Sequence, residues 1–127
     1  MMISLFLATL LSAAPTAQDR PSPTTNAAGS VEALSQENRA VLRCSAAFAL
    51  VGARQARGGD SGRQWPEITV RGREFFVVAL AGIMEERGLG REQISQLVRA
   101  EAERLNREKQ VDAVMPACLL MLESSGV

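Results

Sequence analysis

The stretch FFVVALAGIM, at residues 75–84, contains no polar side chain and decides the expected fold. An amphipathic surface helix presents polar side chains at every turn, and this stretch presents none. We therefore expect a helix that is buried on every side, at the centre of the domain. A buried strand is the competing interpretation for residues 75–80, because Phe and Val favour strands. The continuation through Ala79, Ala81 and Met84 favours the helix.

This central helix is expected to begin at Arg71 or Gly72 and to end at Arg87, before Gly88. A turn-rich loop, GGDSGRQWP, precedes it and separates it from an earlier helix. That earlier helix is capped by Ser30 or Ser35, ends at Gly58-Gly59, and carries one apolar face made of Leu34, Val41, Cys44, Phe48 and Val51.

A charged helix is expected from Arg91 to Lys109. Oppositely charged side chains recur there at a spacing of one helical turn, which indicates a face in water. This helix therefore packs by one side only, along a stripe made of Ile94, Leu97, Val98 and Leu105.

The last expected helix runs from Val111 to Glu123 and contains Pro116. Proline lacks a backbone donor and clashes with the preceding turn of a helix. Pro116 therefore predicts either a kink or the start of a fresh helix. The stretch after it, ACLLML at residues 117–122, is apolar on every side.

Four helices joined by short connections predict a small all-α four-helix bundle for residues 31–127. Three of its helices contain stretches that are apolar all round, at residues 46–51, 75–84 and 117–122. A domain of this size has little interior in which to bury three such stretches. Either the other helices wrap the second one, or apolar surface stays exposed and marks a partner site.

The apolar stretch within residues 1–17, MMISLFLATLLSAAPTA, is too short to span a bilayer and has the length of a signal-peptide core. An uncleaved anchor or an apolar terminus is the alternative interpretation. Residues 18–30 contain two prolines and no large apolar side chain, which predicts a flexible linker. We expect a periplasmic or secreted protein without stable membrane insertion once the signal is removed.

Three segments of the sequence are familiar: CSAAF at residues 44–48, RGREFF at residues 71–76 and MPACLL at residues 115–120. Together they resemble small exported helical proteins of Gram-negative bacteria that contain two cysteines and have no known activity. The resemblance extends over residues 40–124. It implies a helical fold and an exported location, and it implies no chemistry.

Cys44 and Cys118 are the only cysteines of the chain. An exported protein with an even number of cysteines normally pairs them, so we expect a disulfide that staples the first helix to the last. A reactive thiol is the alternative in the exported protein. Two reduced, buried cysteines are the alternative if the protein is not exported.

The composition excludes several functional classes. The chain contains no histidine, which removes Ser-His and Cys-His nucleophile systems and most zinc sites. Its 14 basic and 14 acidic side chains give no net charge, which argues against a nucleic-acid binder. We expect no enzyme, no cofactor and no metal.

Trp65 lies in the longest internal loop and is the only tryptophan. It is interpreted either as an anchor for a partner or, in preference, as a side chain that closes one end of a small core. Arginines flank the same loop and form either a basic edge for an anionic partner or an ordinary solvated surface. They are Arg54, Arg57, Arg63, Arg71 and Arg73.

These features favour a non-enzymatic interaction module in the periplasm, of the adaptor, chaperone-like or inhibitor kind. The alternative is a carrier of a small apolar ligand, held in a pocket between helices. The partner is an unknown protein or a second copy of the chain, and a two-fold homodimer through the first, second or fourth helix is the simplest arrangement.

We predict that the mature protein begins between Ala14 and Arg20, because the short apolar core is followed directly by the linker. Amino-terminal sequencing of native material checks this prediction. Retention of Met1 on a soluble cytoplasmic protein would contradict export.

Overall fold

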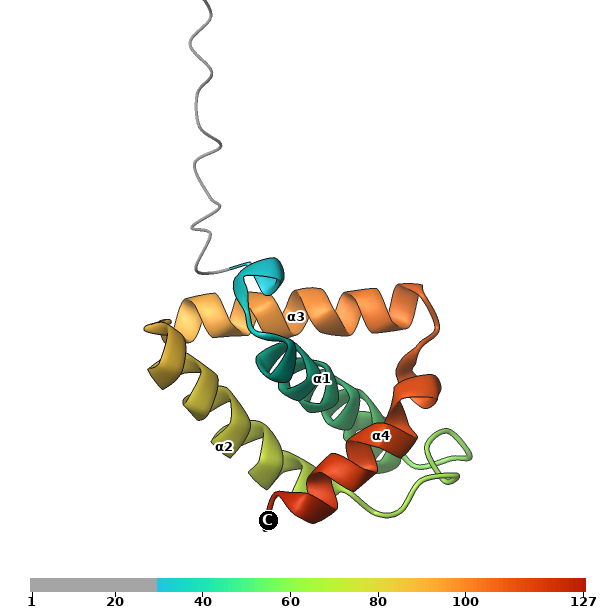
Figure 1. Cartoon of the computed structure of the whole chain (residues 1–127). Coiled ribbons are helices and arrows are strands. Elements are labelled where there is room, and N and C mark those ends of the chain that lie inside the picture. The colour runs from blue at the N-terminus through green and yellow to red at the C-terminus, as the bar shows by residue number, and fades with distance from the viewer. Residues whose placement is uncertain (1–29) are drawn as a thin grey trace, which may run out of the picture.

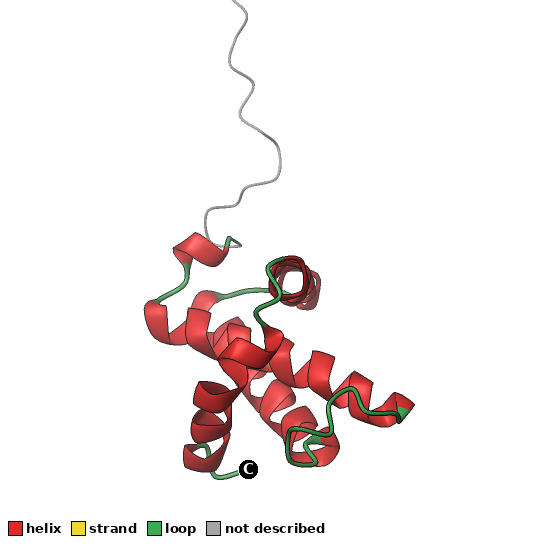
Figure 2. Cartoon of the chain, turned by 90° about the vertical axis from the view of Figure 1, so that its right-hand side faces the viewer, coloured by secondary structure: helices red, strands yellow, loops and turns green. Residues whose placement is uncertain are grey.

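The computed structural model describes residues 30–127. The expected signal peptide (residues 1–17) and all but the last residue of the expected linker (residues 18–30) lie outside the described residues. Residues 30–127 form helices and loops without strands, as Figure 2 shows, so the predicted all-α class is confirmed. The elements are the short 3₁₀ helix η2 (Val31–Ala33), α1 (Gln36–Arg57), α2 (Thr69–Arg87), α3 (Arg91–Arg107) and α4 (Val111–Ser124).

Helix α1 lies at the centre of the bundle, and α2, α3 and α4 are arranged around it (Figure 1). Each of these three helices packs extensively on α1, whereas the contacts of α2 with α3 and α4 are few. Every residue from Cys44 to Phe48 is buried, which requires that a helix be covered from several directions. The prediction that the helix at residues 75–84 occupies the centre is therefore wrong.

Helix α2 is buried on one side only. Residues 75–80 belong to this helix, so the helical interpretation is confirmed over the strand. Phe75, Leu80 and Ile83 are buried. Val77 and Val78, by contrast, are 60% and 63% exposed. The expectation of burial on every side is therefore wrong, because α2 packs mainly on α1 and no described element covers its opposite side. Apolar surface of α2 therefore stays exposed, which was the alternative expectation.

The helix ends follow the expected signals closely. Ser35 caps α1 and accepts a hydrogen bond from the Asn38 N–H at 3.0 Å. Gly88 ends α2 in the left-handed conformation, with a φ of 64°. Helix α2 begins slightly earlier than expected, at Thr69, where the hydroxyl and the backbone N–H of this residue donate to the Glu67 carboxylate. Both hydrogen bonds lower the pKa of Glu67, and the bond from the hydroxyl lowers it more than the bond from the N–H.

Pro116 lies inside α4, which is unbroken from Val111 to Ser124. The expectation of a fresh helix starting at Pro116 is therefore wrong. The proline removes the hydrogen bond that its nitrogen would have donated to the Asp112 carbonyl. Its ring is exposed, so the buried side of α4 is left to Val111, Met115, Cys118 and Leu122.

The core consists of two clusters along α1. The larger one surrounds the disulfide between Cys44 of α1 and Cys118 of α4, whose Cα atoms are 5.1 Å apart. In this cluster Phe48 and Phe75 meet edge to face, with ring centroids 5.3 Å apart. The smaller cluster joins the start of α1 to α2 and α3, and it contains Leu34, Leu42, Leu80, Ile83, Leu89, Ile94 and Leu97.

We predict that replacing both cysteines by alanine destabilises the fold substantially. The disulfide closes a loop with a sequence separation of 74 residues. Closing a loop of that length stabilises a protein by about 4 kcal/mol in the chain-entropy model. Denaturant unfolding of Cys44→Ala/Cys118→Ala measures the loss, and wild-type protein unfolded with reductant serves as the control. Equal midpoints with and without the disulfide would contradict this prediction.

Gly72 sets the close approach of α2 to α1. A Cβ atom at this position would lie 3.2 Å from the Phe48 Cβ, closer than packed side chains normally come. Gly82, in the same helix, has open space at the corresponding position. The two glycines therefore differ in their surroundings, although both lie within α2.

We predict opposite effects for alanine at these two glycines. Gly72→Ala forces α1 and α2 apart and should destabilise by about 1–3 kcal/mol. Gly82→Ala has no steric cost and should stabilise the helix by about 0.5–1 kcal/mol. Thermal or denaturant unfolding of both variants checks the sign of each effect. Equal effects of the same sign would contradict the close packing at Gly72.

Candidate functional site

Trp65 ties the loop after α1 to helix α4. The indole is partly buried and packs against the larger core cluster. Its Nε1 donates a hydrogen bond to the Asp112 carboxylate at 3.0 Å. This placement agrees with the interpretation that Trp65 closes one end of the core. A role as a partner anchor stays a prediction, and only the exposed part of the ring is free for it.

Gln55 fixes the same loop to α1, a role that no sequence pattern indicates. Its side-chain amide donates to the carbonyls of Gly62 and Pro66 at 3.2 and 2.8 Å. Its amide oxygen accepts the Ile68 N–H at 3.1 Å. The amide also donates to the Trp65 carbonyl at 3.4 Å, so one side chain holds four points between Gly62 and Ile68. Its position in α1 nevertheless resembles that of any polar surface residue.

Three of the five arginines around this loop form ion pairs. Arg54 pairs with Asp112 at 3.3 Å, and Arg63 pairs with Asp60 at 3.2 Å. Arg71 pairs with Glu123 at 2.8 Å and also donates to the Val127 carbonyl. Arg57 and Arg73 are exposed and form no ion pair within residues 30–127. Three of the five charges are therefore matched locally, which weakens the attraction of the loop for an anionic partner.

Three of the four large apolar side chains that are exposed in the described segment lie on α2. Val70, Val77 and Val78 are 67%, 60% and 63% exposed, and Ala81 and Gly82 are exposed beside them. These five residues are here called the α2 face. Val70, Val77 and Ala81 lie one above the other on the helix, because seven and eleven residues make nearly two and three whole turns. Val78 and Gly82 lie next to them, on the side that faces the groove toward α4. Glu74 is also exposed, and it is the one carboxylate in the sequence between Val70 and Gly82.

A groove adjoins the α2 face where α2 approaches the end of α4. Its volume is about 360 Å³. Val78 and Gly82 line it from α2, and Met121 and Val127 line it from α4 and the residues after it. Leu120, the neighbour of Met121, is 73% exposed. The groove also contains polar side chains, those of Asn38, Glu86, Ser124 and Ser125, so its lining is mixed.

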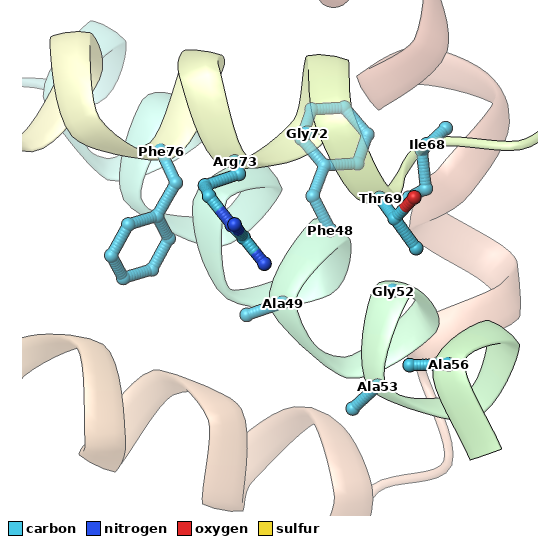
Figure 3. Close-up of a pocket in the computed structure, with 10 residues that line it drawn as sticks. All are labelled: Phe48, Ala49, Gly52, Ala53, Ala56, Ile68, Thr69, Gly72, Arg73 and Phe76. Atoms are coloured by element: carbon cyan, nitrogen blue, oxygen red, sulfur yellow. The ribbon is translucent and has the colours of Figure 1, made fainter.

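A second groove, of about 320 Å³, runs between α1 and α2 (Figure 3). Helix α1 contributes small residues along it, and α2 contributes Phe76 and Arg73. All of its lining residues belong to α1, to α2 or to Ile68 just before α2. The groove thus has walls on two sides, made of Phe48, Ala49, Gly52, Ala53, Ala56, Ile68, Thr69, Gly72, Arg73 and Phe76.

Helix α3 carries one buried carboxylate, that of Glu101, although most of its charged side chains are exposed. Glu101 is 5% exposed, and its carboxylate accepts hydrogen bonds from Nε and Nη2 of Arg104. Arg43 of α1 reaches the same carboxylate, with its Nε at 3.8 Å. Hydrogen bonding to Glu101 raises the pKa of Arg104 further above its usual value, so the guanidinium keeps its charge.

The described segment contains no group of three or more His, Cys, Asp or Glu placed to hold a metal ion. Within the same segment, no helix is both long enough and apolar enough to cross a bilayer. Comparison with family models, with curated proteins and with solved structures gives no match for this chain. The expected kinship with small exported proteins of Gram-negative bacteria stays a prediction.

Proposed function

We propose that this protein is a non-enzymatic interaction module of an oxidising compartment, the periplasm or the exterior, which binds a protein partner through the α2 face. The observation that carries the proposal is the exposure of Val70, Val77 and Val78 on a regular helix of a small bundle. Surface helices normally place charged or polar side chains at such positions. Contiguous apolar surface on a soluble domain usually marks an interaction site.

The disulfide supports the compartment. Cys44 and Cys118 form a bond that persists in secreted and periplasmic proteins, whereas the cytosol keeps thiols reduced. The short apolar segment at the start of the chain supports export in the same direction. An adaptor, a chaperone-like protein and an inhibitor all agree with such a module.

A second copy of the chain is the simplest occupant of the α2 face. A two-fold axis beside Val77 and Val78, near the middle of the face, would bring the face against itself with antiparallel helices. In that register Glu74 of each copy lies opposite Ala81 of the other copy rather than opposite another Glu74. The centre of the contact would then contain apolar side chains, and the two carboxylates would stay at its edge.

A carrier of a small apolar ligand is the alternative function, and the groove between α1 and α2 favours it. Its volume of about 320 Å³ suits a small molecule, and Phe48, Ile68 and Phe76 give it apolar walls. Walls on only two sides would leave part of such a ligand in water. A protein partner that covers both the groove and the α2 face would leave no such apolar surface in water.

Sedimentation of the oxidised protein over a wide concentration range tests the homodimer. We predict that the wild type associates at micromolar concentrations and that Val77→Glu is a monomer, because the new charge would be buried in the contact. Ser95→Glu, on the exposed side of α3, adds the same charge elsewhere and should associate like the wild type. Both variants should unfold like the wild type, since neither side chain is in the core.

A wild type that stays monomeric at high micromolar concentration and binds no apolar dye would overturn the proposal. Dye binding separates the proposal from the carrier alternative. Ala53→Trp fills the groove between α1 and α2, whereas Val77→Glu leaves that groove open. Loss of dye binding in Ala53→Trp alone would support the carrier, and loss in Val77→Glu alone would support the α2 face.

A further inference from the structure

Four arginines line one groove that lies apart from the α2 face. Arg39 and Arg43 come from the first half of α1, and Arg104 and Arg107 come from the last turns of α3. The groove has a volume of about 520 Å³. The remaining lining residues come from η2, α3 and the start of α4, and they are Val31, Glu32, Ala100, Glu101, Gln110 and Val114.

Glu101 organises one part of this groove. It is buried, and the two oxygens of its carboxylate accept from Nε and Nη2 of Arg104, with the Nε distance at 3.1 Å. Nη1 of Arg104 is held by Glu108 at 2.8 Å, and Arg43 approaches Glu101 from the other helix. These contacts fix the guanidinium of Arg104, so this charge has little rotamer freedom left to lose on binding.

Arg39 and Arg107 are not used by this network. Neither forms an ion pair within residues 30–127, and they project into the groove from different helices. The groove holds four guanidinium groups against two carboxylates, those of Glu32 and Glu101, with Glu108 at its edge. A positive excess therefore gathers here, in a chain whose net charge is zero.

We infer that this groove binds a small organic anion with at least two carboxylate or phosphate groups. The planar fork of a guanidinium matches both kinds of oxyanion and can bind either through two parallel hydrogen bonds. A ligand with two anionic groups can pair with Arg39 of α1 and Arg107 of α3 at the same time, one group to each guanidinium. The volume of the groove suits a small molecule, and Val31, Ala100 and Val114 offer apolar contact to its carbon skeleton.

Extended polyanions fit this groove less well. Nucleic acid and anionic membranes are bound by broad basic surfaces, whereas this excess is confined to one groove in a chain with balanced charge. Arg57 and Arg73 also form no ion pair within residues 30–127, and they belong to the end of α1 and the start of α2. Neither lines this groove, so they provide matched controls.

Calorimetric titration of the oxidised, full-length protein tests the inference, with citrate as the carboxylate probe, pyrophosphate as the phosphate probe and acetate at matched ionic strength. We expect saturable binding of citrate, pyrophosphate or both, and none of acetate. Arg39→Gln and Arg107→Gln should each weaken binding by roughly tenfold or more, because each removes a charged hydrogen-bond partner. Arg57→Gln and Arg73→Gln should bind like the wild type.

The preferred probe shows which oxyanion the groove takes. Absence of saturable binding of both probes at millimolar concentration would overturn the inference. Equal weakening by the groove variants and the control variants would also overturn it, because it would show a general effect of charge. Circular dichroism of each variant checks that it is folded. Because Arg39 and Arg107 lie on different helices, a local change in one helix would not explain weaker binding by both variants. Val77→Glu should bind the anion normally, so this result is independent of the homodimer.

Discussion

The close packing around the middle of α1 is the constraint on which the rest of the structure depends. Ser45, Ala46 and Ala47 are fully buried and small, so neighbouring helices can approach the backbone of α1 from several directions. Gly72 removes the side chain that would otherwise hold α2 away from Phe48. The disulfide at Cys44 fastens α4 to the same segment. With α1 occupying the interior, the other helices each bury one side, and the apolar stretch of α2 has an outer side left over.

This arrangement explains which parts of the fold could be predicted from the sequence. Helix limits were predictable because Ser35, Gly58 and Gly88 act locally, through hydrogen bonds and backbone conformations that depend on few neighbours. Which helix lies at the centre was not predictable from apolar content. That content does not distinguish apolar side chains that pack against another helix from apolar side chains that face water. The stretch at residues 75–84 is more apolar than α1, yet small residues rather than apolar ones determine which helix can be surrounded.

The same distinction applies to the functional residues. Trp65 was recognisable as a residue with a special position, since a single tryptophan in a loop is unusual in itself. Gln55 and Glu101 were not recognisable. Gln55 owes its role to backbone groups of the following loop, and Glu101 owes its burial to the packing of α1 on α3. Arg104 follows Glu101 by three residues, so the ion pair could be predicted, but its burial depends on α1 packing against α3. The packing of α1 on α3 therefore places the Glu101–Arg104 pair in the lining of the arginine groove.

The attachment of the loop to Gln55 has a practical consequence for engineering the molecule. The connection between α1 and α2 is the longest in the described segment, and its length alone would recommend it for inserting a peptide tag or for opening the chain by circular permutation. The part from Gly62 to Ile68 is unsuitable, because Gln55 and Asp112 hold it against the bundle. The tip at Gly58–Ser61 is exposed and lies before these attachments. An insertion there would lengthen the loop without displacing Trp65 or altering the start of α2.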